Sequence, residues 1–273
     1  MPHFSQQRSA GGCGAPATEL GVDCGVMQRV TLLVSVTLTL GVTAGVAQSP
    51  RAANPERPTV ATHAYAVAPG YVEIEQGISA RGAASLRDAT SWDVNVKIGI
   101  APHLQLGLFG PGYARNGAGH GVGDWGFALK LRADASDQAA VAVVPAITLP
   151  TGKEQLGLGA GRVLGQLPLV LSIDGPAGVH ADFNAGPLGI GAGRMQWLTT
   201  ASFGRRVGGP FGLTAELYRI SAGSAGPRQA GLLGALVVTP VQWMVIDIGG
   251  TTGLGSGSPD VVFIGLTTNL GRL

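Results

Sequence analysis

The stretch GDWGFALKLRAD, from Gly123 to Asp134, alternates large apolar side chains with small or charged ones at every second position. Successive side chains of a β-strand point to opposite faces, so this stretch predicts a strand with one apolar and one polar face. Such a strand suits either the surface of a soluble sandwich or the wall of a membrane barrel with lipid outside and water inside. The apolar face holds Trp125, Phe127, Leu129 and Leu131, and the other face holds Gly126, Ala128, Lys130 and Arg132.

The composition of the chain favours the membrane barrel. Charged residues make up 12% of the 273 residues, which is about half of the share that soluble domains usually carry. The formal net charge of +2, without a basic run, argues against a nucleic-acid partner. The 45 glycines follow no triplet period and suit the bends of a barrel wall.

The N-terminal region carries a predicted secretion signal. An uncharged apolar run from Val30 to Val46 leads into a small-x-small cleavage pattern that ends at Ala47. We therefore assign residues 27–47 as a signal peptide, with a membrane-anchoring helix as the alternative. Residues 1–26, which contain both cysteines, are expected to be a disordered leader or the product of a start codon upstream of the true one.

The remaining chain is divided into a short segment and a barrel. Residues 48–69 are rich in Pro and Ala, and we assign them as a periplasmic segment, with a plug folded back into the lumen as the alternative. Residues 70–273 form the predicted barrel, because no apolar run after the signal is long enough for a membrane helix. Period-two patterns predict twelve strands at residues 71–80, 91–100, 103–109, 124–133, 139–149, 167–173, 179–185, 196–206, 211–220, 229–238, 241–249 and 260–270.

The connections between these strands alternate in length. A chain that crosses a membrane back and forth, with tight periplasmic turns and long external loops, produces this rhythm, whereas a soluble Greek-key sandwich does not require it. The fold class is therefore all-β, an antiparallel up-and-down transmembrane β-barrel of about twelve strands. Short connections lie at 101–102, 134–138, 174–178, 207–210 and 239–240, and long ones at 81–90, 110–123, 150–166, 186–195, 221–228 and 250–259.

The chain also resembles a known family. The resemblance covers roughly residues 71 to 270 and is carried, in this order, by GVGDWGFALKLR from Gly121, VAVVPAITLPTGK from Val141, HADFNAG from His180, FGLTAELY from Phe211 and GALVVTPVQWMVIDIG from Gly234. These stretches are similar to the MetA-pathway phenol-degradation family of outer-membrane barrels, which is loosely akin to the FadL-type transporters of hydrophobic compounds. The resemblance implies a transporter of small apolar or aromatic molecules.

Ionisable residues on the predicted inward faces are the candidate lumen-lining groups. Charges within a membrane segment are unfavourable unless they face water or one another. They are therefore expected either to line a passage or to form ion pairs that hold a narrow barrel shut. The set is Glu73, Glu75, Asp93, Lys97, Asp124, Lys130, Arg132, His180, Asp182, Arg206, Glu216 and Asp247.

Aromatic residues near predicted strand ends are assigned to an interfacial girdle. Trp243 is expected in mid-strand on the opposite face, so an ordinary core position is its alternative. The girdle candidates are Tyr71, Trp92, Trp125 and Trp197.

The sequence predicts no catalytic, metal or cofactor site. Thr151-Gly152-Lys153 lacks the hydroxyl residue and the glycine spacing of a phosphate-binding loop. His180 is the one histidine within a polar strand face, and no Gly-x-Ser-x-Gly elbow accompanies it. No pair of histidines has metal-ligand spacing.

We therefore expect a channel in the outer membrane of a Gram-negative bacterium for passive passage of small, hydrophobic or aromatic molecules. The expected partners are outer-membrane lipid, the solute and the barrel assembly machinery. One alternative is a structural or receptor barrel with a plugged lumen. Another is a lipid-modifying barrel enzyme, which would depend on His180.

Overall fold

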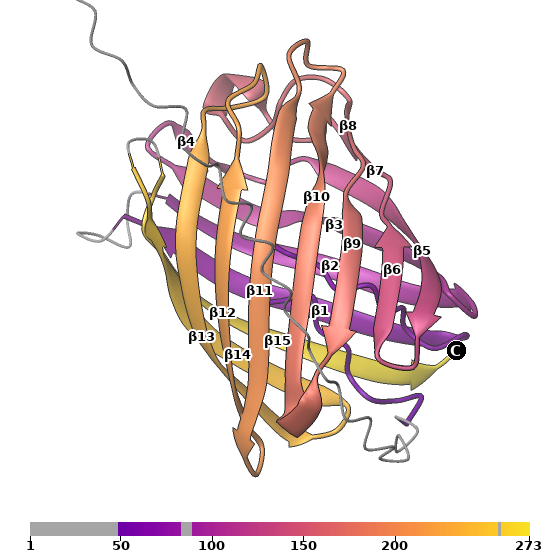
Figure 1. Cartoon of the computed structure of the whole chain (residues 1–273). Coiled ribbons are helices and arrows are strands. Elements are labelled where there is room, and N and C mark those ends of the chain that lie inside the picture. The colour runs from indigo at the N-terminus through magenta and orange to yellow at the C-terminus, as the bar shows by residue number, and fades with distance from the viewer. Residues whose placement is uncertain (1–48, 83–88, 256–257) are drawn as a thin grey trace, which may run out of the picture. The chain divides into compact units, whose positions relative to one another are not determined.

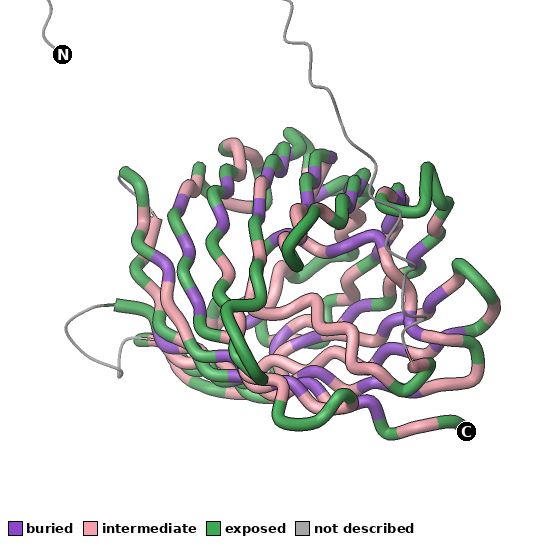
Figure 2. Tube along the Cα trace, turned by 60° about the horizontal axis from the view of Figure 1, so that its bottom comes forward, coloured by how far each residue is buried: buried purple, intermediate pink, exposed green. Residues whose placement is uncertain are grey.

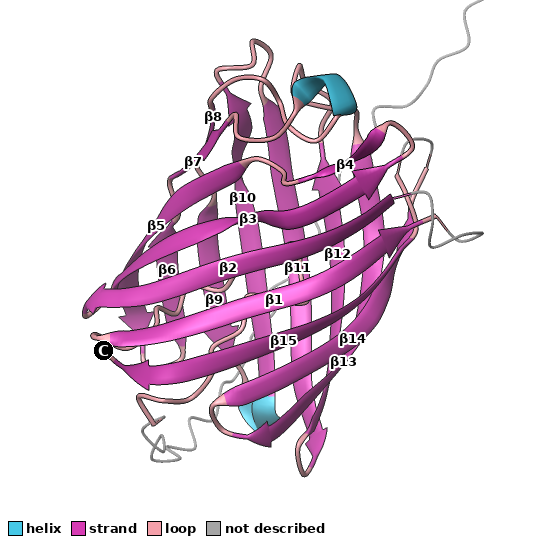
Figure 3. Ribbon diagram, turned by 180° about the vertical axis from the view of Figure 1, so that it is seen from behind, coloured by secondary structure: helices cyan, strands magenta, loops and turns pink. Residues whose placement is uncertain are grey.

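Antiparallel strands build the wall of the protein, and in the computed structural model they close on themselves (Figures 1 and 3). The structure describes residues 49–82, 89–255 and 258–273, so the predicted leader and signal peptide lie outside the described residues. The strands are β1 (Tyr71–Arg81), β2 (Ala89–Ala101), β3 (Leu104–Asn116), β4 (Gly119–Gly121), β5 (Trp125–Ser136), β6 (Ala139–Val143), β7 (Ala146–Leu149), β8 (Leu164–Gln166), β9 (Leu169–Asp174), β10 (Val179–Ile190), β11 (Gln196–Gly208), β12 (Phe211–Ile220), β13 (Gln229–Val241), β14 (Met244–Gly253) and β15 (Val261–Arg272).

The wall consists of twelve strands, as the sequence predicts. β6 and β7 form one strand interrupted at Val144-Pro145, and β8 and β9 form another interrupted at Leu167-Pro168. Proline has no N–H to donate to the ladder, which explains both interruptions. β4 pairs only with the last residues of β3, Ala114 to Asn116. The pairing of β1 with β15 closes the barrel.

Two short 3-10 helices lie in the connections, η1 (Glu154–Leu156) and η2 (Pro176–Gly178). Neither these nor any other helix among the described residues has the length and hydropathy of a membrane span.

Several predicted strand boundaries are wrong. β3 continues to Asn116 and β10 to Ile190, beyond the predicted ends at 109 and 185, because Gly110-Pro111 and Gly186-Pro187 lie within these strands and do not end them.

The predicted turn near Trp243 is also misplaced. β13 continues to Val241 and β14 begins only at Met244, so the turn lies later than the predicted Thr239-Pro240 connection. Trp243 is therefore in this turn and not in mid-strand, and the Arg51 guanidinium lies 5.2 Å from the centre of its ring. Pro240 fits the end of a strand because its missing N–H is tolerated there.

Buried and exposed residues alternate along the strands (Figure 2). The largest fully buried side chains of the described residues are polar, which is the reverse of the pattern in a soluble protein. Among the largest fully buried side chains of the described residues are Lys97, Lys130 and Glu73. Large apolar side chains on the opposite strand faces are exposed instead, for example Phe127 at 44% and Leu131 at 45%. Lys and Glu are almost never fully buried unless they are paired, so the inside of the barrel must supply partners, and the outside requires an apolar surrounding.

Candidate functional site

Residues 49–70, called here the N-terminal segment, run through the inside of the barrel. Their main chain is hydrogen-bonded to inward side chains of strands far apart around the wall, among them β1, β9, β10 and β12. These contacts do not fit the assignment of residues 48–69 as a periplasmic segment and agree with its alternative, a segment folded back into the lumen. An extended chain without a neighbouring strand needs acceptors for its N–H groups, and the polar inner face supplies them.

Three glutamates bind the main chain of the segment. Glu73 accepts the N–H of Asn54 at 2.7 Å, and Glu75 accepts that of Glu56 at 2.7 Å. Glu216 accepts two further N–H groups, from Val60 at 2.7 Å and from Ala61 at 2.6 Å. Hydrogen bonds to a charged acceptor are stronger than neutral ones, so these carboxylates fix the path of the segment.

Neutral side chains of the barrel wall also bind the main chain of the segment. Three more main-chain N–H groups of the segment are bound by an amide, a hydroxyl and a second amide, at 2.7–2.9 Å. These three residues are not in the predicted lumen-lining set, which holds only ionisable groups, although their strand parity marks them as inward-facing. The pairs are Asn184 with Thr62, Ser172 with Ala64, and Gln105 with Val67.

The buried lysines of the wall are neutralised by carboxylates. Lys97 lies 2.6 Å from Glu73 and also contacts Glu75, while Lys130 lies 2.5 Å from Glu56 of the segment. Buried charges require such partners, because an isolated charge in a low-dielectric interior is strongly unfavourable. Burial raises the pKa of Glu56, but the positive charges of Lys130 and Lys97 outweigh burial and hold the pKa below its usual range.

A second cluster joins the segment to β9 and β10. His180 lies between Asp174, at 2.8 Å, and Asp182, at 2.9 Å. The Tyr65 hydroxyl donates to Asp174, and the Ser172 hydroxyl donates to Asp182 at 2.5 Å. Because Ser172 donates to a carboxylate and not to the imidazole, the cluster lacks the nucleophile–base contact of a hydrolase.

Glycines make room for the segment at its closest approaches to the wall. A Cβ at Gly99 would overlap the carbonyl oxygens of Val67 and Ala68. A Cβ at Gly77 or at Gly265 would overlap the guanidinium of Arg57. Arg57 itself reaches Asp247 at 3.3 Å, so small residues and a paired charge together accommodate it.

The structure brings most of the predicted lumen-lining residues together around the segment. The other four of the twelve form no hydrogen bond or ion pair with the described residues of the segment. Asp93 lines a cavity beside the segment, Asp124 accepts N–H groups of the external loop from Gly152 and Ala160, and Arg206 is exposed near a short turn. Arg132 stacks over the Tyr65 ring at 4.7 Å and pairs with Asp134. The remaining eight are Glu73, Glu75, Lys97, Lys130, His180, Asp182, Glu216 and Asp247.

The aromatic girdle candidates lie toward the ends of their strands. Trp92 and Trp197 are 40% and 56% exposed and lie near the long-loop end of the wall, where Trp125 also starts its strand. Tyr71 begins β1 at the opposite, short-turn end. Their role at a membrane interface stays a prediction.

Two cavities remain beside the N-terminal segment. One of about 330 Å³ is enclosed by the segment and by β2, β3, β5 and β10–β12, and the other, of about 300 Å³, lies against β2 and β3. They share Glu56, Asn95 and Phe109. These volumes are at the lower end of the range for small-molecule sites.

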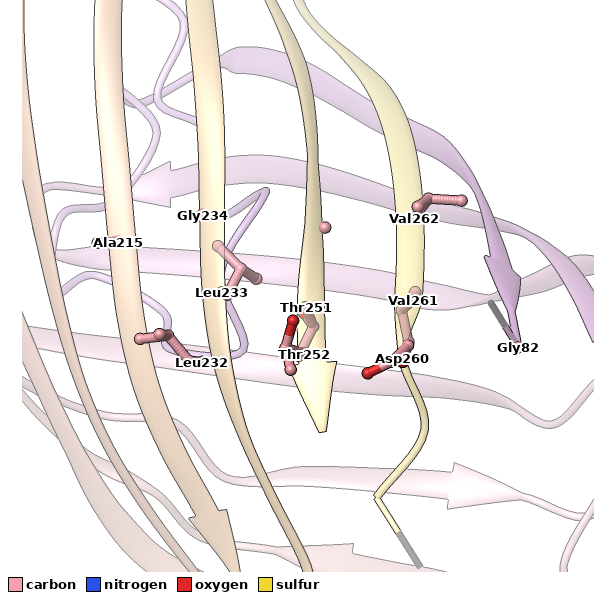
Figure 4. Close-up of a pocket in the computed structure, with 11 residues that line it drawn as sticks. Gly82, Ala215, Leu232, Leu233, Gly234, Thr251, Thr252, Asp260, Val261 and Val262 are labelled. Atoms are coloured by element: carbon pink, nitrogen blue, oxygen red, sulfur yellow. The ribbon is translucent and has the colours of Figure 1, made fainter. Parts of the chain in front are cut away.

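A hollow of about 740 Å³ lies on the outward side (Figure 4). Its floor is a row of small residues that lie opposite one another on β12, β13 and β14, namely Ala215, Gly234 and Gly250. Exposed Leu232 and Val262 flank it. We therefore interpret it as part of the apolar outer surface and not as a solute site.

Metal binding finds no support in the described residues, where no three His, Cys, Asp or Glu side chains are grouped to hold an ion.

Comparisons with known proteins agree on the fold. The COG4313 outer membrane channel from Pseudomonas putida F1 superposes with a TM-score of 0.59 at 12% identity, over 78% of this chain and 100% of that chain. The KdgM porin in complex with disordered oligogalacturonate gives 0.54 at 7% identity, over 72% and 98%. The NanC porin gives 0.50 at 10% identity, over 73% and 100%. No protein-family model and no curated protein matches the chain, so the resemblance to the MetA-pathway family stays a prediction.

Proposed function

We propose that this protein is a channel in the bacterial outer membrane for passive passage of small, hydrophobic or aromatic molecules. The closed barrel with its apolar outer face suits lipid on one side and a polar lumen on the other. Three solved porins and channels of the same fold support this location and role.

The observation that carries the proposal is the space that the closed barrel keeps beside the N-terminal segment. Two cavities of about 330 and 300 Å³ remain there, and they suit small molecules. The buried lysines are each paired with a carboxylate. They therefore provide no row of unpaired positive charges along which an acidic polymer could bind. Passage through the barrel then requires the segment to move aside.

Single-channel conductance of the full chain in a planar bilayer tests the proposal. A disulfide between the segment and the wall, from Ala64→Cys and Ser172→Cys, locks the segment in place, because Ala64 N lies 2.7 Å from Ser172 Oγ. Both native cysteines are replaced by serine. We expect oxidation to abolish conductance and reduction to restore it, and we expect phenolic or alkane-like solutes to block the open channel.

A matched disulfide within the wall serves as the control. Leu213 and Leu236 are cross-strand partners on the outward face, so a Leu213→Cys, Leu236→Cys bridge leaves the segment free. Equal conductance of the segment-locked and wall-locked proteins would contradict gating by the segment. Insertion without conductance in every redox state would contradict the channel and favour the structural or receptor alternative.

A further inference from the structure

The cavity of about 330 Å³, called here the chamber, has a mostly apolar wall. Phe109, Leu188, Leu198 and Ile220 contribute to this wall from four different strands. The N-terminal segment contributes Glu56, Val60 and Thr62 to the lining. Apolar walls with a few placed polar groups are the usual make-up of a small-molecule site.

Two amides face the chamber without a bound partner. Gln105 and Asn184 also line it, but their side chains are engaged by the main chain of the segment. Asn95 and Gln166 differ, because within the described residues their side chains make no hydrogen bond. An amide offers two donors and an acceptor, so each can bind a group that both donates and accepts.

The charges at the chamber cancel. Lys130 and Glu56 line it as an ion pair at 2.5 Å, and Lys130 also contacts the Tyr65 carbonyl at 3.2 Å. Neither charge is free to bind an ionic ligand without breaking this pair. A carboxylate or an ammonium ion entering the chamber would lose its hydration without gaining a counter-ion.

We propose that the chamber is a binding site for a small uncharged molecule with an apolar body and a hydroxyl group, held by Asn95 and Gln166. This inference rests on the proposed function and names the class of solute that the lumen selects. A site built to hydrogen-bond a hydroxyl discriminates strongly against the analogue that lacks it, because the amides then stay unpaired. The chamber therefore selects alcohols over hydrocarbons of the same size.

Calorimetric titration of the detergent-solubilised full chain tests the proposed binding site, because it measures binding and does not require the solute to cross the barrel. The probes are benzyl alcohol, toluene and benzoate, which share one ring and differ in the polar group. We expect saturable binding of benzyl alcohol, at least about tenfold weaker binding of toluene, and no binding of benzoate. The variant Ala128→Phe, which fills the chamber, gives the baseline for partition into detergent.

Two variants assign the binding to the amides. Asn95→Leu and Gln166→Leu keep the approximate side-chain volume and remove the hydrogen-bonding groups. Each should therefore weaken the binding of benzyl alcohol about tenfold and leave the binding of toluene unchanged. Gln138→Leu, in an exposed turn far along β5–β6 from the chamber, is the matched control and should bind as the parent chain does.

The outcomes separate this inference from the channel itself. Equal affinity for toluene and benzyl alcohol, or unchanged binding in both amide variants, would overturn the inference. Absence of binding in a protein that conducts normally would also overturn it while leaving the channel intact. Binding lost with the amides in a protein that never conducts would support the site and contradict the channel.

Discussion

Lys130 Nζ lies 2.5 Å from Glu56 Oε1 inside the barrel, so an ion pair joins the wall to the N-terminal segment. The lysine side chain is 2% exposed and the glutamate 21%. Breaking such a pair is unfavourable, because either charge left alone would have to recruit water into the interior.

Replacing the lysine should release the segment. Lys130→Met leaves Glu56 without its counter-ion, and breaking a buried pair in this way weakens the folded arrangement by about 3 kcal/mol. We expect faster proteolysis of the segment and more frequent channel opening. The double variant Glu56→Gln, Lys130→Met should recover part of the loss, whereas Lys153→Ala, on an exposed loop, should change neither quantity. Slower or unchanged proteolysis in Lys130→Met would contradict the role of the pair.

Replacing Glu216 should also release the segment, but through lost hydrogen bonds and not through a lost ion pair. Glu216→Ala removes the acceptor of two main-chain N–H groups, and each buried donor left unpaired is unfavourable by about 1–3 kcal/mol. Thiol labelling of a cysteine introduced at Ala61, which is 2% exposed, measures the release of the segment. We expect labelling to accelerate in Glu216→Ala and less in Glu216→Gln, which keeps one acceptor. Glu154→Ala, in an external loop, is the carboxylate control.

Acidic pH should loosen the segment through His63. Its Nε2–H donates to the Asn54 carbonyl at 3.2 Å, while its Nδ1 is buried without a partner among the described residues. Burial, reinforced by the charge of Lys130, lowers the pKa of His63 to about 3, from an ordinary value of 6.5. Besides Lys130, the charged groups around it are Glu56, Lys97 and Asp182.

The direction of the pH effect on segment binding follows from the lowered pKa of His63. The released segment takes up a proton more readily than the bound one, so binding is strongest above pH 6.5 and weakens as the pH falls toward 3. At pH 5 the loss is about 2 kcal/mol. Conductance measured between pH 7.5 and 5 should therefore rise with acidity, and the rise should be smaller in His63→Gln. A rise of the same size in that variant would assign the effect to another group.

Gly99 should tolerate no larger side chain. Gly99→Val places atoms where the carbonyl oxygens of Val67 and Ala68 lie, so the end of the segment must move away. We expect higher conductance and faster cleavage near residues 67–68. Gly117→Ala is the matched control, because a Cβ there meets nothing within 4 Å. Equal effects of the two substitutions would contradict a steric cause.

The sequence determined the strands and their faces. The period of two in Trp125 to Leu131 needs only the geometry of a strand, and repetition of that period along the chain, with alternating loop lengths, was enough to predict the twelve-stranded barrel. The inward parity of Glu73, Lys97 and Lys130 follows from the same local rule. The errors concerned strand ends, near Trp243 and in β3 and β10, where Gly and Pro interrupt the period of two.

Only the tertiary structure decided what those inward residues contact. Residues 54–67 have no period that marks a binding partner, since their main-chain N–H groups carry the contacts and every sequence offers those groups. Glu216 lies 156 residues along the chain from its partner Val60, and Asn184 lies 122 residues from its partner Thr62. Closure of the barrel alone brings these residues together. A local pattern can assign a side chain to a face, but three-dimensional closure determines which groups meet across the lumen.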